Sequence, residues 1–356
     1  MSGAAGGRSL LRRNLAPVLV ALGAFLLTLA VLLNTYVYGT LAMLPGDTEA
    51  EWRLEDESAT YLDTATWRTA KKAAVAQRTE VRGSTAPGNS RWSTWEVSVD
   101  TVAADRMIGH MDRRVIVDRS TGLAVNCCGE HVDGDRAVRQ AGLVRQWPAG
   151  GSAGDHPFYD ADLRAAPMMR FDGTENVAGV SARRYVQEVA ATQVPGSARA
   201  VPAHALGGRG NGTVQATRWL EVTRTLWVEP VTGRVVNAEE QRTETLRAEG
   251  GRGRDRVLLD ADLAMPDFQV KAAAEQAESH ALRLRLTGSW LPMGLGGLGG
   301  AVALAGLAVA FARRGRGQGR EGREGRESQE GPSTQSGRDA APAAEPVAES
   351  PEQQPG

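Results

Sequence analysis

Apolar residues are concentrated in two long uncharged runs, one near each end of the chain. The first run extends over residues 14–46 and is almost wholly apolar at residues 15–33, and the second covers residues 290–312. A helix rises about 1.5 Å per residue, so about 19 residues span roughly 28 Å, close to the ~30 Å hydrocarbon core of a bilayer. The pattern therefore predicts transmembrane helices at residues 15–37 and 290–312.

Charges beside the two runs predict how they are oriented. Three arginines lie within residues 1–14, before the first run, whereas the first charge after it is Asp47. Four arginines lie within residues 313–320, directly after the second run; two precede it within residues 283–285, so the bias there is weaker. Because positively charged flanks stay in the cytoplasm, we expect a protein of the cytoplasmic membrane with both termini inside. Residues 45–289 would then lie outside.

A cleaved signal peptide is the alternative to the first span, because a basic start followed by an apolar run is typical of both. The apolar region of a signal peptide is normally shorter, about 7–15 residues, and no small-x-small cleavage pattern is evident here. We therefore expect an uncleaved signal anchor.

The second run is rich in glycine. Gly296 and Gly300 form a GxxxG pair, which lets another helix approach closely. The pair predicts contact with the first span or with a second copy of the chain, and hence a homo-oligomer. The alternative is a span that is merely rich in small residues.

Residues 313–356 form a C-terminal tail without aromatic residues, composed largely of Gly, Arg, Glu, Ser, Pro and Gln. Such a segment cannot bury enough apolar surface to offset the entropy of ordering. We therefore expect a disordered cytoplasmic tail.

Between the spans, apolar and polar positions alternate with the period of β-strands. Residues 92–102 alternate in this way, and two later hairpins have Asp or Pro at the start of a turn and Gly near its end. Past Pro266, apolar residues recur at helical spacing, which predicts a helix over residues 267–286. The predicted fold is therefore a mainly β (α+β) extracytoplasmic domain, residues 45–289, bracketed by two transmembrane helices.

The two hairpins resemble each other in sequence. Residues 114–126 align without gaps on residues 225–237, with identical pairs at Val117/Val228, Thr121/Thr232, Gly122/Gly233, Val125/Val236 and Asn126/Asn237. This similarity suggests two related antiparallel β-units, residues 45–145 and 170–265. The alternative is that any two hairpins with a Thr-Gly turn look alike.

Composition adds one unusual chemical feature. The formal net charge of −1 gives no electrostatic reason to expect a nucleic-acid partner. The only cysteines, Cys127 and Cys128, are adjacent, and thiols outside the cytoplasm tend to be oxidised. A vicinal disulfide that clamps the turn is one hypothesis; a redox-active switch, free buried thiols and intermolecular bonds are the others.

The sequence contains no constellation that indicates catalysis. The five histidines are scattered without a zinc-binding motif, and no phosphate-binding glycine loop is present. Residues 150–154 match the letters of a hydrolase elbow but lie in a predicted loop instead of a strand-to-helix turn. We therefore expect no catalytic residues, no bound cofactor and no metal site, and a non-enzymatic protein.

Four motifs together resemble the PorA-type porin family of actinobacteria. They are VDRSTGLAVNCCG at 117–129, GLVRQWP at 142–148, HPFYD at 156–160 and MRFDGTENVAG at 169–179. The resemblance covers roughly residues 15–312, and it implies a membrane protein with an outer domain between two spans and channel formation by some members. It implies no catalytic residues. The sequence departs from the family in AGGSAGD at 149–155 and in the glycine-rich residues 207–212.

The strands themselves do not suit a membrane-spanning β-barrel, whose outer face is an apolar band. Charges alternate along residues 239–244, which suits a strand with water on one face and a core on the other. We therefore expect the outer domain to bind an envelope component, either lipid or a partner protein. Channel formation is the alternative, and an extracytoplasmic hydrolase is a third reading.

Overall fold

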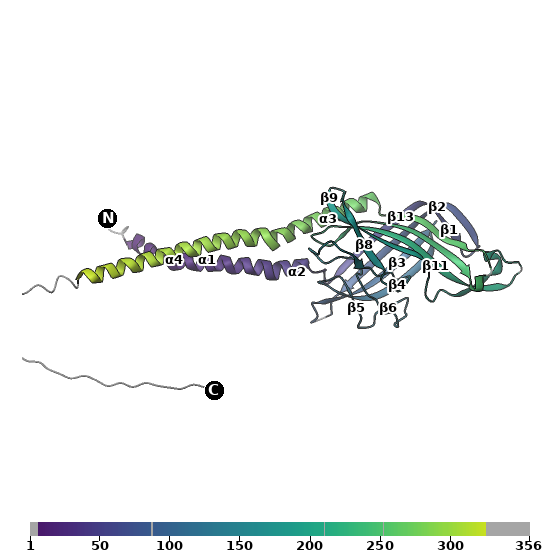
Figure 1. Cartoon of the computed structure of the whole chain (residues 1–356), viewed down its shortest axis with the longest axis horizontal. Coiled ribbons are helices and arrows are strands. Elements are labelled where there is room, and N and C mark those ends of the chain that lie inside the picture. The colour runs from purple at the N-terminus through teal and green to yellow at the C-terminus, as the bar shows by residue number, and fades with distance from the viewer. Residues whose placement is uncertain (1–5, 87, 210, 252, 325–356) are drawn as a thin grey trace, which may run out of the picture. The chain divides into compact units, whose positions relative to one another are not determined.

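Helices occupy both ends of the chain in the computed structural model, which describes residues 6–86, 88–209, 211–251 and 253–324. The N-terminal helical elements are α1 (Gly6–Leu32), the π-helical η1 (Leu33–Val37) and α2 (Tyr38–Ala42). The C-terminal ones are α3 (Asp267–Arg285), the π-helical η4 (Leu286–Trp290) and α4 (Leu291–Glu324), which follow one another without a break (Figure 1). The stretches Leu15–Ala42 and Asp267–Arg314 are long and apolar enough to cross a membrane.

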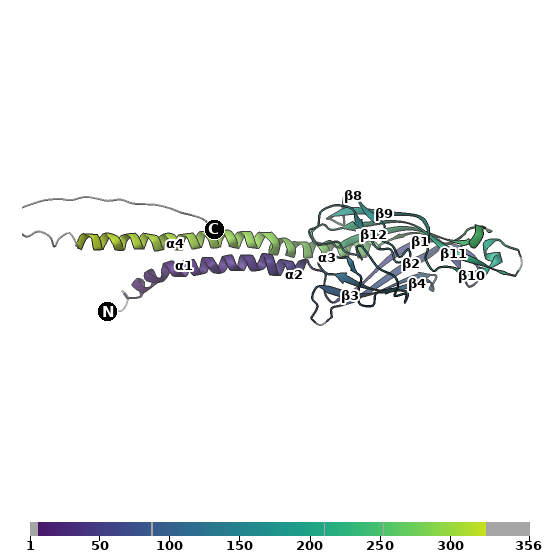
Figure 2. The ribbon, with the colours of Figure 1, turned by 60° about the horizontal axis from the view of Figure 1, so that its bottom comes forward.

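A 13-stranded sheet lies between these helices in the sequence. Its strand order is β5-β4-β3-β2-β1-β13-β12-β11-β9-β8-β7, with β6 paired to β4 and β10 paired to β11 (Figures 1 and 2). The strands are β1 (Thr48–Asp63), β2 (Arg68–Ser84), β3 (Trp92–Ala103), β4 (Arg106–Asp118), β5 (Ala124–Val125), β6 (His131–Val132), β7 (His156–Pro157), β8 (Met168–Val177), β9 (Val180–Gln193), β10 (Arg199–Pro202), β11 (Thr213–Val228), β12 (Val235–Ala248) and β13 (Arg256–Ala264). The predicted fold class, a mainly antiparallel β domain bracketed by two apolar helices, is confirmed.

Two meanders make up the sheet. Strands β1–β4 pair in chain order, and so do β8, β9, β11, β12 and β13. The meanders join where β1 pairs with β13, with Tyr61 opposite Leu259. The units expected at residues 45–145 and 170–265 therefore belong to one continuous sheet. Whether they arose by duplication stays a hypothesis.

The two similar hairpin sequences fold into turns with the same hydrogen bonds. In the first turn, the Gly122 N–H donates to the Asp118 carbonyl (2.8 Å); in the second, the Gly233 N–H donates to the Glu229 carbonyl (2.8 Å). The carboxylate of Asp118 or Glu229 also accepts hydrogen bonds from backbone N–H groups inside its own turn. Both glycines have positive φ, +72° and +70°, which glycine adopts at little cost.

Residues 142–162, here called the crossing segment, connect the two turns. The Val144 N–H donates to the Gly122 carbonyl (3.1 Å), and the Trp147 N–H donates to the Gly233 carbonyl (2.9 Å). Trp147 belongs to the main hydrophobic core, where its ring lies 4.8 Å from that of Tyr185 between centroids. The segment is therefore held by backbone hydrogen bonds at both turns and by an aromatic anchor between them.

Helix α3 packs against the sheet with one small-residue face. Its buried residues are Ala274, Ala277, Ala281 and Leu284. Ala277 joins a cluster with Trp227 of β11 and Val236 of β12. The helix expected over residues 267–286 thus corresponds to α3.

Both terminal helices are longer than the predicted spans. The first helical stretch covers residues 6–42 instead of 15–37, and α4 continues to Glu324. Residues 313–324 are therefore helical, which corrects the expectation that the whole of residues 313–356 is disordered. Extending an existing helix fixes one residue per added hydrogen bond and avoids the cost of nucleation, and Arg and Glu favour helices. The remainder of the expected tail lies outside the described residues.

Replacement of Gly233 by alanine should destabilise the fold by about 3 kcal/mol. The new Cβ would collide with the Trp147 carbonyl oxygen, in addition to the strain of positive φ in a non-glycine residue. Gly179→Ala is the matched control, because Gly179 also has positive φ but nothing lies within 4 Å of its Cβ position; it should cost about 1 kcal/mol. Chemical unfolding of both variants measures the difference. Equal losses would show that the crossing segment does not constrain this turn.

Candidate functional site

A cavity of about 160 Å³ lies between the two meanders and the crossing segment. Its wall includes residues of β1–β4, β11 and β12, together with residues 144–145 and 158–162. The apolar part of this wall includes Trp52, Leu54, Val81, Trp95, Val97, Val99, Val144 and Leu226. A second cavity of about 520 Å³ shares Gln77, Val99, Met111, Ala161, Asp162 and Arg242 with the first, so the two adjoin.

The alternation of side chains along each strand determines which residues form this wall. In β3, Trp95 and Val97 are buried while Glu96 between them is exposed, because successive side chains of a strand point to opposite faces. In β2, Val81 follows the same rule, with the exposed Arg82 on the other face. The sequence pattern thus selects which side chains face the cavity, and the packing of the crossing segment covers them.

A network of buried ion pairs lies beside the cavities. Arg242 of β12 contacts three carboxylates: Asp162 (2.6 Å), Glu240 (3.0 Å) and Glu244 (2.6 Å). Arg224 of β11 contacts Glu240 (2.8 Å) and Asp160 (3.2 Å), and also donates to the Gln187 amide oxygen (2.7 Å). Arg218 contacts Asp162 (2.5 Å) and Glu244 (3.0 Å). These ion pairs connect the crossing segment to β11 and β12.

The network keeps its members ionised despite burial. Burial would raise the pKa of Asp162, but Arg242 and Arg218 outweigh it and lower this pKa below its usual value. Burial likewise would lower the pKa of Arg242, but Glu244 and Asp162 raise it well above its usual value. Each of the three arginines is therefore matched by at least two carboxylates, an arrangement that stabilises the charged forms.

Two other arginines of the cavity wall have no carboxylate partner. The guanidinium of Arg145 stacks on Trp52, with Cζ 3.1 Å from the ring centroid, and makes no hydrogen bond or ion pair with any described residue. Burial lowers the pKa of Arg145 to about 9, and the positive charge of Arg234 acts in the same direction. A partly buried cation with only a cationic neighbour is in an unfavourable electrostatic environment.

Arg113 is the second such arginine and is only 8% exposed. It lies over the Tyr159 ring, with Cζ 5.4 Å from the centroid, and donates to the Gln140 amide oxygen at 3.4 Å. Burial lowers the pKa of Arg113 to about 10. Its Nε, Trp95 Nε1 and the Tyr159 hydroxyl have no hydrogen-bond partner among the described residues. The cavity wall therefore contains several donors whose hydrogen bonds are not made by the protein.

Most of the charged residues of strand segment 239–244 do not face water, although their alternation had led us to expect that they would. Its alternation suggested charges facing water, yet Glu240, Arg242 and Glu244 are buried, whereas Glu239 and Gln241 are exposed. Both faces of this strand are polar. Burial of the charged face is possible because arginines of β11 and aspartates of the crossing segment supply opposite charges, and alternation within one strand cannot reveal these partners.

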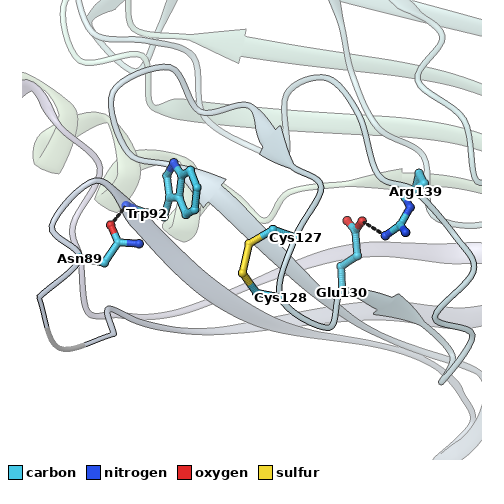
Figure 3. The surroundings of a disulfide bond; sticks show 6 residues. All are labelled: Asn89, Trp92, Cys127, Cys128, Glu130 and Arg139. Carbon is cyan, nitrogen blue, oxygen red and sulfur yellow. Dashed lines mark hydrogen bonds and ion pairs between the residues drawn. A yellow bond between two sulfur atoms is a disulfide. The ribbon is translucent and has the colours of Figure 1, made fainter.

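Cys127 and Cys128 are joined by a disulfide in the loop between β5 and β6 (Figure 3). Cys128 has φ of +65°, and neither residue lines the two cavities. Nearby, the buried Glu130 pairs with Arg139 at 3.0 Å (Figure 3). The two cysteines therefore lie in a surface turn, away from the cavity wall.

Gly296 and Gly300 have no neighbour within 4 Å of an added Cβ. Gly306 behaves differently, because a Cβ there would lie 2.9 Å from the Val20 side chain of α1. The close approach of the two helices within one chain therefore uses Gly306. Pairing through Gly296 and Gly300 with a second copy stays a prediction.

Sequence reasoning did not identify Trp52, Arg113 or Arg145 as site residues. Arg145 lies in the motif at 142–148, directly after Val144 and two residues before Trp147, and a cation so close to these apolar residues was the available signal. The serine of the hydrolase-like letters, Ser152, is exposed and makes no hydrogen bond with a described residue. The geometry there does not resemble an activated nucleophile.

Comparisons with known proteins match most of the chain. The family model described as porin PorA matches residues 15–308. Porin PorA of Corynebacterium amycolatum is 22% identical over 298 residues, which cover 65% of this chain and 77% of that protein. The matched range includes every strand of the sheet.

Replacement of Arg242 by methionine should destabilise the protein by about 3–5 kcal/mol, because it leaves buried carboxylates without their cation. Arg78→Met is the matched control: Arg78 also pairs with two glutamates, Glu51 and Glu80, but is 49% exposed. The control should change stability little, since exposed pairs contribute little. Denaturant unfolding of the purified chain measures both. Similar losses would contradict a special role for the buried network.

Proposed function

The chain belongs to the porin PorA family, as its four motifs indicated, and we propose that it acts as a membrane-anchored, non-enzymatic protein that binds an amphiphilic envelope component. In this proposal residues 45–289 lie outside the cytoplasm and both termini lie inside. The bilayer is its first partner, and a second copy of the chain is a further one.

The observation that carries this proposal is the cavity beneath the crossing segment. Protein interiors are normally packed without voids larger than a water molecule. Here valines, tryptophans and leucines, together with the charged residues described above, line about 160 Å³ that no side chain fills, and a larger cavity adjoins it. Ligand sites are typically concave and mostly apolar with a few placed polar groups, and this cavity has that composition.

The position of the crossing segment supports a ligand that comes from the membrane. The first helical stretch ends at the Asp118 turn, where the Leu44 N–H donates to the Arg119 carbonyl (2.7 Å). A Cβ at Gly150 of the crossing segment would lie 3.5 Å from the Tyr38 hydroxyl of α2. Tyrosine and tryptophan concentrate at the membrane–water interface, so the crossing segment would lie close to the outer leaflet.

The test is native mass spectrometry of the full chain extracted from its own membranes. We expect co-purified lipid, and we expect its occupancy to fall severalfold in Val99→Trp, which fills the wall shared by both cavities. Met107→Trp on β4 is the control, because Met107 is 61% exposed; its occupancy should equal that of the unmodified chain. A lipid-free unmodified chain, or a folded Val99→Trp variant with full occupancy, would refute the proposal.

Channel formation is the second candidate, and the family description and the name of the relative favour it over a binding role. The strand order ends at β5 and β7, and bridges from Leu143 to Leu123 beside β5 and to Phe158 beside β7 connect these two ends. In this second candidate, helices of several copies would form the channel. Gly296 and Gly300, which are half-buried, are suited to such contacts.

Conductance in planar bilayers tests the channel. If several copies form a pore through the glycine face, the unmodified chain should give discrete current steps, and the Gly296→Leu/Gly300→Leu double variant should not. Leu298→Ile on the same helix is the conservative control and should retain the steps. Absence of current steps from the unmodified chain at several protein concentrations would count against a channel.

A further inference from the structure

We propose that the ligand of the cavity is an anionic amphiphile, and that Arg145, stacked on Trp52, holds its carboxylate or phosphate group. This inference rests on the proposed binding function and adds the chemical class of the ligand and the residue that recognises it.

The contrast among the arginines of the cavity wall is the first argument. Arg224 and Arg242 are saturated by carboxylates of the protein, which is what a purely structural role requires. Arg145 is held in place by an aromatic ring but has no hydrogen-bond acceptor among the described residues. A guanidinium presents five N–H donors in a planar fork that suits oxyanions. A positioned fork without an acceptor is what an oxyanion site requires before its ligand binds.

The local charge is the second argument. Burial lowers the pKa of Arg145, and the charge of Arg234, which has the same sign, lowers it further. Arg234 itself donates to the Gln276 amide oxygen of α3 (3.3 Å) and forms no ion pair within the described chain. Two neighbouring cations in a partly desolvated place repel each other and lack counter-charge. A bound anion would relieve both costs.

The carboxylates of the same wall do not supply that counter-charge. Asp160, Asp162 and Glu240 are engaged by Arg218, Arg224 and Arg242, and Glu239 is exposed. Arg113, on the same wall, also forms no ion pair with a described residue. The excess of donors over free acceptors favours an anion over a cation or a neutral sugar.

The apolar wall is the third argument, and it indicates a ligand larger than a small ion. Val97 and Val144 line the cavity that contains Arg145, and burying apolar chain against such a wall contributes about 25 cal/mol per Å². A free phosphate or acetate would use the guanidinium and leave this wall without a partner. An anion with a hydrocarbon chain would use both.

A merely structural role for Arg145 is the competing explanation, since stacking on Trp52 stabilises the segment. The two explanations differ in what Arg145→Gln does. A structural arginine would lower the unfolding temperature when replaced. An unpartnered cation kept for a ligand would leave the unfolding temperature of the ligand-free chain unchanged or raise it, because an uncompensated charge is removed.

The experiment measures binding of four probes to the full chain, delipidated and reconstituted in phosphatidylcholine nanodiscs. The radiolabelled probes are dodecanoate, dodecyl phosphate, dodecanol and inorganic phosphate, with binding to empty nanodiscs subtracted. We expect the two anionic amphiphiles to bind at least about tenfold more tightly than dodecanol, as for hydrogen bonds to charged groups. Inorganic phosphate should bind more weakly than dodecyl phosphate.

Variants test whether Arg145 causes the preference for anions over dodecanol. In Arg145→Gln the tenfold preference for anions over dodecanol should disappear while dodecanol still binds. Arg145→Lys should retain part of the preference, because a lysine keeps the charge but loses the planar fork. Arg82→Gln is the charge-matched control, since Arg82 is 73% exposed, and it should retain the full preference.

The outcomes separate the two proposals. Equal binding of dodecanol and the anions would leave the binding function standing and overturn the anion inference. If inorganic phosphate bound as tightly as dodecyl phosphate, the inference that the ligand is an amphiphile would be overturned. Failure of all probes to bind would overturn both proposals. Loss of preference in a variant that is still folded, by circular dichroism and unfolding temperature, supports the assignment to Arg145.

Discussion

The backbone hydrogen bonds from the crossing segment to the two glycine turns are the constraint on which the rest of the β domain depends. They join Val144 to Gly122 and Trp147 to Gly233, and so fix the segment at the ends of two hairpins that belong to different meanders. A glycine is required at both turns because the segment's carbonyl groups occupy the place of a Cβ. With both ends fixed, Trp147 enters the core and Arg145 lines the cavity.

A second consequence is that the charged face of β12 can be buried. The aspartates that complete its ion pairs, Asp160 and Asp162, lie on the same crossing segment. If that segment were displaced, Arg242 would lose one of its carboxylates, and an uncompensated buried charge destabilises a fold strongly. The hydrogen bonds at the turns and the ion pairs in the interior therefore hold the same segment.

The family match and the cavity concern different parts of the molecule. The family description and the relative's name concern pores, and the two apolar helices are the part of the chain that suits a membrane. The sheet has charged side chains on both faces of β12, and the two cavities adjoin the buried one of these faces. An anchored binding domain and helix-mediated assembly use separate surfaces, so they are chemically compatible within one protein.

The sequence by itself determined the two apolar helices and the mainly β domain, because hydrophobic periodicity and turn chemistry are local properties of the chain. The family was indicated by the resemblance of four motifs. It also indicated the matching turns at Asp118 and Glu229. Only the tertiary structure decided that residues 239–244 bury their charges and that Arg145 lacks a carboxylate while Arg242 has three. The physical reason is that burial and ion pairing depend on partners far away in the chain, and a single strand's alternation carries no information about what covers it.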